Sequence, residues 1–113
     1  MANAKKDPKY KDILFEVVDQ VAWLTMNRPH TLNASREVTL DEIADAVRST
    51  RDDPSIACVV ITGAGDRSFC AGGDFASMKK LNWVTGMHWN ERMLGCAMAI
   101  RSEERRVGKE CRP

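Results

Sequence analysis

A chain of 113 residues is long enough for one small domain or for part of a larger one, and its 43% hydrophobic and 29% charged residues argue against disorder. The net charge of +1 comes without a basic stripe, and no apolar run approaches the roughly 20 residues of a membrane-spanning helix. We therefore expect neither a nucleic-acid nor a membrane partner. The four cysteines form no C-x-x-C pair and no zinc set with the two histidines, so we expect no metal site and a cytoplasmic protein with reduced thiols.

The first predicted elements are two strands that follow a short arm. Residues 1–12 are polar and lack an apolar signal core, so we expect a disordered arm there. Residues 13–18 and 21–27 show the alternation and the β-branched side chains of strands. Asp19 and Gln20 between them predict a two-residue hairpin, in which glycine is the favoured second residue.

A helix and a third strand come next. The helix is predicted over residues 36–51, with Ser35 as its N-cap. Its inner face carries, at helical spacing, Leu40, Ile43, Ala44 and Val47. Residues 56–62 are almost continuously apolar, which predicts a strand buried on both faces of a parallel sheet. A helix between two parallel strands implies a right-handed crossover.

The most informative segment is Ser-Phe-Cys-Ala-Gly-Gly-Asp at residues 68–74. Gly72 and Gly73 lie between the third strand and a short helix predicted over about 75–81. A backbone without Cβ atoms can approach a ligand closely, and its N–H groups can converge on one oxygen, as in an oxyanion hole. The alternative is that both glycines only permit a tight turn.

Two helices follow the glycines. Asp74 is expected to cap the short helix at its N-terminus, where a carboxylate also meets the positive end of the dipole. A second helix is predicted over residues 85–101. One face of that helix carries Trp89, Met93, Ala97 and Ile100.

Gly63 and Gly65 follow a strand, as the first two glycines of a dinucleotide fingerprint would. The third glycine position is Ser68, however, and no helix begins there. The Gly-Lys-Ser/Thr of a P-loop is also absent. The sequence therefore disfavours a nucleotide cofactor.

Three segments in order resemble the enoyl-CoA hydratase/isomerase (crotonase) superfamily. They are a strand followed by N-R-P-x-x-x-N-A at residues 23–34, the strand 56–62 leading into Gly63-Ala64-Gly65, and the glycine segment 68–74. The resemblance runs from about Leu14 to Arg101. It implies an α/β, crotonase-like (ClpP/crotonase) fold of repeated β-β-α units, incomplete in this chain.

The resemblance also implies roles for individual residues. Gly73 matches the position whose backbone N–H holds the thioester oxygen, and Asp74 follows it in the same substrate-binding segment. His30 and Leu32 match the loop that holds the adenine and pantetheine of coenzyme A. Ala71 and Phe75 match positions that line the pantetheine and acyl pocket, although a packing role for Phe75 fits equally well.

The function that the resemblance implies is hydration or isomerisation of an acyl-CoA thioester through an enolate, as in an enoyl-CoA hydratase, a lyase of fatty acid metabolism, or an enoyl-CoA isomerase. Coenzyme A would be part of the substrate, with no other cofactor, and the whole enzyme would be a homo-trimer or hexamer. The alternative is a non-catalytic acyl-CoA-binding or assembly module.

The resemblance stops at Arg101. In relatives, a second oxyanion donor and the catalytic acids lie further along the chain, and neither is found here. We therefore expect residues 13–101 to be the N-terminal part of a crotonase-like domain and residues 102–113 to be a non-native tail. On this reading the isolated chain is inactive.

Overall fold

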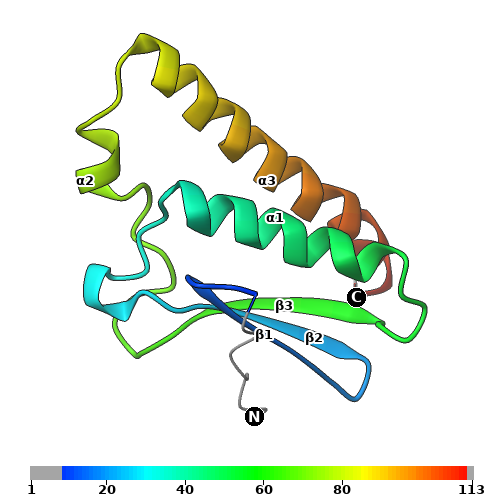
Figure 1. The fold of residues 1–113 in the computed structure, drawn as a ribbon. Coiled ribbons are helices and arrows are strands. Elements are labelled where there is room, and N and C mark those ends of the chain that lie inside the picture. Colours follow the sequence, from blue (N-terminus) through cyan, green and yellow to red (C-terminus); the bar gives the residue numbers. More distant parts are fainter. Residues whose placement is uncertain (1–8, 112–113) are drawn as a thin grey trace.

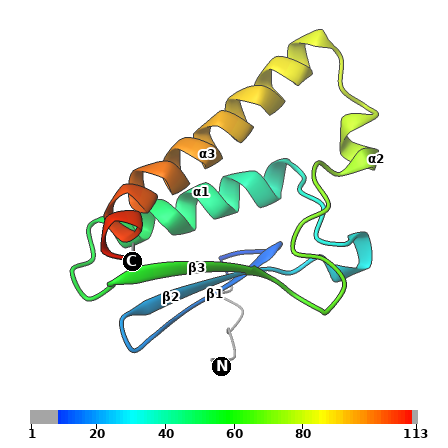
Figure 2. The same ribbon diagram turned by 180° about the vertical axis from the view of Figure 1, so that it is seen from behind.

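The computed structural model describes the backbone of residues 9–111 and the side chains of residues 9–101. It is a layered α/β structure in which helix α1 lies between a three-stranded sheet and helix α3 (Figures 1 and 2). The strands lie in the order β1-β2-β3, with β1 and β2 antiparallel and β2 and β3 parallel. The elements are β1 (Ile13–Val18), β2 (Val21–Met26), η1 (Pro29–Thr31), α1 (Glu37–Arg51), β3 (Cys58–Gly63), α2 (Phe75–Met78) and α3 (Trp83–Cys111).

The β1–β2 hairpin closes on two residues, as the sequence predicts. Val18 pairs with Val21, and both residues between them have positive φ, +50° at Asp19 and +71° at Gln20. These angles belong to the tight hairpin turn whose twist matches that of the strands. The Gln20 carbonyl also accepts from the N–H of Ala57, which ties the turn to the start of β3.

We expect Gln20→Gly to raise the free energy of unfolding by about 1 kcal/mol, because a side chain in the left-handed region costs roughly 1–2 kcal/mol and glycine avoids most of it. The carbonyl bond to Ala57 is retained. Urea unfolding followed by circular dichroism measures the change. Gln20→Ala is the control, since it keeps the Cβ and is expected to change little; equal stability of the two variants would contradict the argument.

Helix α1 forms the core layer. Its predicted inner face is confirmed, because Leu40, Ile43, Ala44 and Val47 are all buried. The start of the helix differs from the prediction: Arg36, not Ser35, occupies the N-cap, and its N–H donates to Thr39 Oγ1 at 3.2 Å. Ser35 instead pairs its backbone with the glycine segment.

Burial of β3 is lower than predicted. All six of its residues are half-buried, although a strand buried on both faces was expected. The strand lies at one edge of the sheet, and within residues 9–111 the helices cover only one face (Figure 2). The parallel pairing of β3 with β2 is confirmed.

The helices after the glycines also differ in extent. Helix α2 is a single turn rather than the predicted 75–81. Helix α3 begins at Trp83, before the predicted Thr85, because the Asn82 side chain accepts from the N–H groups of Val84 and Thr85. Its backbone continues past the expected end at Arg101 to Cys111.

The buried face of α3 is only partly the predicted one. Trp89 is buried, as are Cys96 and Ala99, whereas Met93 and Ala97 are exposed. The helix therefore meets α1 along a stripe rotated from the expected one. In the described residues, no helix is both long and apolar enough to cross a membrane.

The segment before β1 takes part in the core. Tyr10 and Asp12 are only 5% and 3% exposed, and Tyr10 packs edge-on against Phe15. Packing thus begins before Ile13, within the range 1–12 that was expected to be an arm. Residues 1–8 of that range lie outside the described residues.

Candidate functional site

The loop that follows β2 is organised by one buried amide. Asn33 is 2% exposed and lies in the left-handed region with φ of +59°. Its Oδ1 accepts from the N–H of Arg28 at 2.9 Å. Its Nδ2 donates to the carbonyls of Ala64 at 3.0 Å and Ser68 at 2.8 Å, both in the loop after β3. Asn33 therefore holds this loop through side-chain to backbone bonds.

Backbone bonds then join the same loop to the glycine segment. The N–H of Ala71 donates to the Leu32 carbonyl at 3.1 Å. Ser35 donates to the Gly72 carbonyl at 2.7 Å and accepts from the Asp74 N–H at 2.6 Å. These two bonds form an isolated parallel bridge between Ser35 and Gly73.

The two adjacent glycines are required for different reasons. Gly72 has φ of +113°, a conformation that other residues rarely adopt, and a Cβ there would meet nothing within 4 Å. A Cβ on Gly73 would lie 2.5 Å from Met78 Sδ and 3.3 Å from the Trp89 ring. A tight turn therefore explains Gly72, whereas close packing explains Gly73.

The Gly73 N–H is a free donor. Gly73 is exposed, and among the described residues its N–H has no hydrogen-bond acceptor. The bridge to Ser35 is made by the carbonyl of Gly72 and the N–H of Asp74. The N–H of Gly73 takes no part in this pairing. A fixed, exposed backbone donor can bind an oxygen from a ligand.

Asp74 lies beside this donor and caps α2, as predicted. Its Oδ2 accepts from the Ser77 N–H at 3.0 Å and from the Ser77 hydroxyl at 2.9 Å. The hydroxyl bond has the largest effect on the Asp74 pKa, and together with the Ser77 N–H and the charge of Arg28 it holds that pKa below its ordinary value against the opposing effect of burial. Asp74 is therefore ionised at neutral pH.

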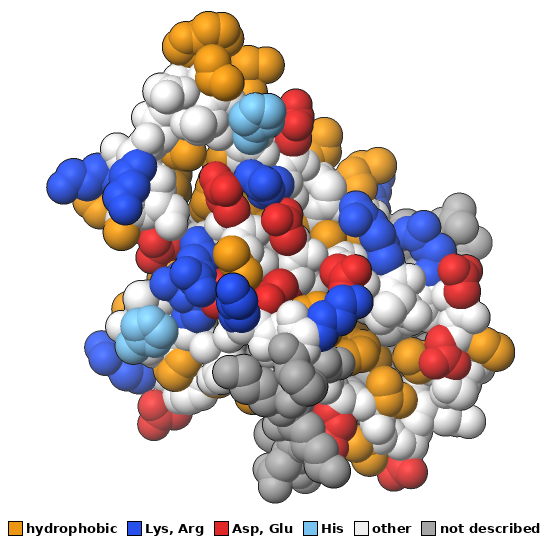
Figure 3. Space-filling view, in the orientation of Figure 1, with side chains coloured by type: hydrophobic (Ala, Val, Ile, Leu, Met, Phe, Trp, Pro, Cys, Tyr) orange, Lys and Arg blue, Asp and Glu red, His pale blue; other side chains and the backbone are white. Residues whose placement is uncertain are grey.

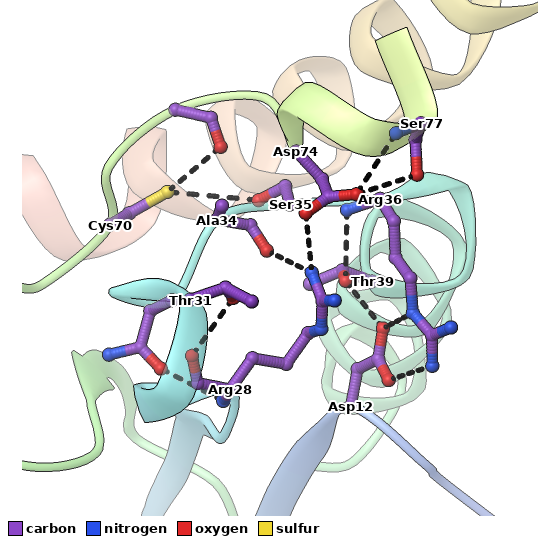
Figure 4. Close-up of polar contacts among 12 residues, drawn as sticks. Asp12, Arg28, Thr31, Ala34, Ser35, Arg36, Thr39, Cys70, Asp74 and Ser77 are labelled. Atoms are coloured by element: carbon purple, nitrogen blue, oxygen red, sulfur yellow. Dashed lines mark hydrogen bonds and ion pairs between the residues drawn. The ribbon is translucent and has the colours of Figure 1, made fainter. Parts of the chain in front are cut away.

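Arg28 approaches Asp74 from the loop after β2 (Figure 4). Its Nη1 lies 3.6 Å from Asp74 Oδ1 and donates to the Ala34 carbonyl at 2.6 Å. Both charged side chains are only 13% exposed. Sequence reasoning did not assign this pair, although Arg28 belongs to the N-R-P motif.

The predicted site residues are only partly brought together. Leu32 and Ala71 are joined by a backbone bond, and Gly73 and Asp74 lie beside them through the bonds that Ser35 makes to Gly72 and Asp74. By contrast, the side chains of His30 and Phe75 face solvent, with Phe75 80% exposed. Within residues 9–101, the hydrogen-bond contacts of the Cys70 thiol are with Ser35 Oγ at 3.7 Å and the Gly72 carbonyl at 3.9 Å, and no histidine is among its partners.

Two hollows flank the patch. One, of about 90 Å³, is bounded by Leu32 and Asn33 on one side and by the loop from Ala64 to Ser68 on the other. The second, of about 340 Å³, lies between the start of α1 and α2 and includes Arg36 and Lys80. Lys and Arg side chains gather on the side of the molecule that carries α2 and η1 (Figure 3). No group of His, Cys, Asp or Glu within the described residues is arranged to hold a metal ion.

Comparison with known proteins gives consistent matches. The family model for enoyl-CoA hydratase/isomerase matches residues 21–94. Crotonyl-CoA hydratase from Syntrophomonas wolfei is 45% identical over 73 residues, which are 65% of this chain and 28% of that protein. The chain spans between 28% and 29% of the length of two curated relatives.

Solved structures show the same likeness. An enoyl-CoA hydratase/carnithine racemase from Magnetospirillum magneticum superposes with a TM-score of 0.78 at 25% identity, over 82% of this chain and 36% of that one. A carnitinyl-CoA hydratase from Mycobacterium avium gives a TM-score of 0.60 at 38% identity, over 61% of this chain and 26% of that one. The fold is thus the α/β fold of crotonase-like proteins, present over part of their length. The chain belongs to the enoyl-CoA hydratase/isomerase family.

Proposed function

We propose that this site binds an acyl-CoA thioester and that the Gly73 N–H donates to the thioester carbonyl oxygen. The observation that carries the proposal is the N–H of the exposed residue Gly73, which has no acceptor among the described residues although the backbone groups on either side of it are paired. Family membership and a relative named crotonyl-CoA hydratase support the ligand class.

The chemistry explains why such a donor would be needed. Hydration and isomerisation of an enoyl thioester pass through an enolate, whose charge develops on the carbonyl oxygen. A fixed N–H at that oxygen stabilises the charge, and losing one such donor typically costs about 2.7–4 kcal/mol of transition-state stabilisation. The whole protein would then be an enoyl-CoA hydratase or isomerase that assembles as a homo-trimer or hexamer.

Asp74 is not the proton donor in this proposal. Its lowered pKa keeps it ionised at neutral pH, and its carboxylate is already engaged with Ser77 and Arg28. We assign no acid or base among the described residues. Little turnover of crotonyl-CoA by this chain alone therefore stays a prediction, as do the contacts of His30 and Phe75 with substrate.

The test compares Gly73→Pro with Gly73→Ala. Both add a Cβ that must displace Met78, but only proline removes the N–H. We expect the unmodified chain to bind crotonyl-CoA more tightly than free coenzyme A in titration calorimetry. A hydrogen bond is worth about 0.5–1.5 kcal/mol net, so Gly73→Pro should lower this preference by about two- to twelve-fold.

Gly73→Ala is expected to keep the preference, because the Met78 side chain is flexible and can move. Thermal unfolding of both variants checks that each is folded. A folded Gly73→Pro variant with an unchanged preference for crotonyl-CoA would refute the role of the Gly73 N–H. Equal affinity of the unmodified chain for crotonyl-CoA and coenzyme A would refute the proposed function.

A further inference from the structure

We propose that Arg28 and Asp74 are positioning residues, whose ion pair holds the Gly73 N–H in place for the thioester oxygen. The inference rests on the proposed function and adds residues that do not touch the ligand. Arg28 comes from the loop after β2, and Asp74 immediately follows Gly73 in the chain.

The contacts of Arg28 connect the two sides of the Ser35–Gly73 bridge. One guanidinium nitrogen, Nη1, donates to the Ala34 carbonyl at 2.6 Å and lies 3.6 Å from Asp74 Oδ1. Ala34 directly precedes Ser35, and Asp74 directly follows Gly73. The Arg28 guanidinium therefore contacts both segments of the bridge, beside Ser35 on one and beside Gly73 on the other. These contacts oppose separation of the two segments.

Arg28 is itself firmly anchored. Its carbonyl accepts from the N–H of Thr31 at 3.0 Å, from the Thr31 hydroxyl at 3.1 Å and from the N–H of Asn33 at 2.8 Å. Its own N–H donates to Asn33 Oδ1 at 2.9 Å. Both peptide units that flank the Arg28 Cα are thus held by hydrogen bonds, so the guanidinium reaches Asp74 from a fixed point.

Asp74 is anchored in the same way. Its N–H donates to the Ser35 carbonyl at 2.6 Å, and its Oδ2 takes both bonds from Ser77. The other carboxylate oxygen, Oδ1, is left for Arg28. The peptide unit that carries the Gly73 N–H is held through its Gly72 carbonyl, which accepts from the Ser35 N–H at 2.7 Å, and the fixed residue 74 restrains the backbone of Gly73 from the other side.

Burial makes the charge interaction effective. Both side chains are 13% exposed, and solvent screens such a pair less than an exposed one. A second cation near Asp74 is Arg36, which is itself paired with Asp12. Removal of the Asp74 charge would leave the Arg28 guanidinium without the carboxylate that its Nη1 faces.

The cap and the ion pair can be separated by one substitution. Asn caps a helix about as well as Asp, so Asp74→Asn keeps an acceptor for Ser77 and removes the charge that Arg28 meets. Asp53→Asn is the matched control. Asp53 likewise accepts from the N–H and hydroxyl of a serine two residues on, Ser55, but it lies before β3 and faces no arginine in the described part of the chain.

The measurement is the ratio of the dissociation constants for coenzyme A and crotonyl-CoA, with the Gly73 amide followed by ¹⁵N NMR. We expect Asp74→Asn to lower this ratio by about three-fold or more, as for a weakened hydrogen bond, and to shift the Gly73 amide signal. Asp53→Asn should leave both unchanged. Arg28→Lys keeps the charge but replaces the rigid planar guanidinium with an ammonium on a flexible stem, so an intermediate ratio is expected.

Each outcome decides the inference. A folded Asp74→Asn variant with the ratio of the unmodified chain would overturn the positioning role, even where Gly73→Pro confirms the proposed function. If Asp74→Asn does not fold, Arg28→Gln, which removes the cation, takes its place, and an unchanged ratio there has the same meaning. Absence of any preference for crotonyl-CoA in the unmodified chain defeats the proposed function and this inference together.

Discussion

Asn33→Ala is expected to lower the free energy of unfolding by about 3–5 kcal/mol, because three partly buried backbone groups lose their partner and each unpaired group costs about 1–3 kcal/mol before solvent reaches it. Those groups are the Arg28 N–H and the carbonyls of Ala64 and Ser68. Alanine would also have to adopt the left-handed φ of +59°, which adds roughly 1 kcal/mol. Urea unfolding followed by circular dichroism gives the value.

Two further substitutions at this position separate the causes. Asn33→Gly removes the same bonds without backbone strain, so it should be less destabilising than alanine by about 1 kcal/mol. Asn33→Asp keeps the size, the tolerance of positive φ and the acceptor for Arg28, but it turns an oxygen toward the carbonyls of Ala64 and Ser68. Near-normal stability of the aspartate variant would show that the two Nδ2 bonds are unimportant.

The same amide explains the need for Gly63. A Cβ at that position would lie 2.8 Å from Asn33 Nδ2 and would also collide with the carbonyl of Phe69. The glycine therefore leaves room for the bonds that join the two loops. These loops in turn carry the backbone that pairs with Gly72 and Asp74, so packing at the end of β3 bears on the geometry of the proposed donor.

Local patterns in the sequence predict much of this architecture. The hairpin at Asp19-Gln20 and the buried face of α1 follow from alternation and helical spacing, which depend on near neighbours in the chain. The Asp74 cap is predictable for the same reason, because its partner Ser77 is one helical turn away. The loop-fixing role of Asn33 also follows from the preference of asparagine for turns.

Features that depend on distant contacts were not predictable. The half-burial of β3 depends on which faces of the sheet are covered, and no local pattern in residues 56–62 contains that information. The shifted stripe on α3 depends on the angle at which it meets α1. The Arg28–Asp74 pair arises only when two loops are brought side by side, so neither residue signals the other in the sequence.

Asp12 also contacts residues that are distant in the chain, and its replacement is expected to have a large effect on stability. Asp12 is 3% exposed and binds Arg36 through two bonds of 2.7 and 2.6 Å and the Thr39 hydroxyl at 2.6 Å. We expect Asp12→Asn to lower the free energy of unfolding at pH 7 by about 2–3 kcal/mol, toward the lower end for a broken buried pair because Arg36 can reach water.

The loss should depend on pH in a defined direction. Burial acts to raise the Asp12 pKa, but the hydrogen bonds from Arg36 and Thr39 and the charges of Arg36 and Arg28 outweigh it, so the folded-state pKa is lowered. A carboxyl with a lowered folded pKa stabilises the fold fully above its unfolded pKa of about 3.9 and loses that contribution as the pH falls toward the folded value. The difference between the two proteins should therefore shrink below about pH 4.

Asp45 supplies the control for this titration. The hydrogen bond from Lys9 and then that from Tyr10 lower its pKa, but the ion pair with Lys9 is exposed, and such pairs are worth about 0–1 kcal/mol. Asp45→Asn should thus change the free energy of unfolding far less than Asp12→Asn at pH 7. Parallel curves for the unmodified chain and Asp12→Asn from pH 7 to pH 3 would show that Asp12 is not the titrating group. If the difference in free energy of unfolding disappears only as the Asp12 carboxyl protonates, the acid sensitivity of the fold lies in the contact between Asp12 and the start of α1. Arg36, at the start of that helix, directly follows Ser35 of the bridge in the chain.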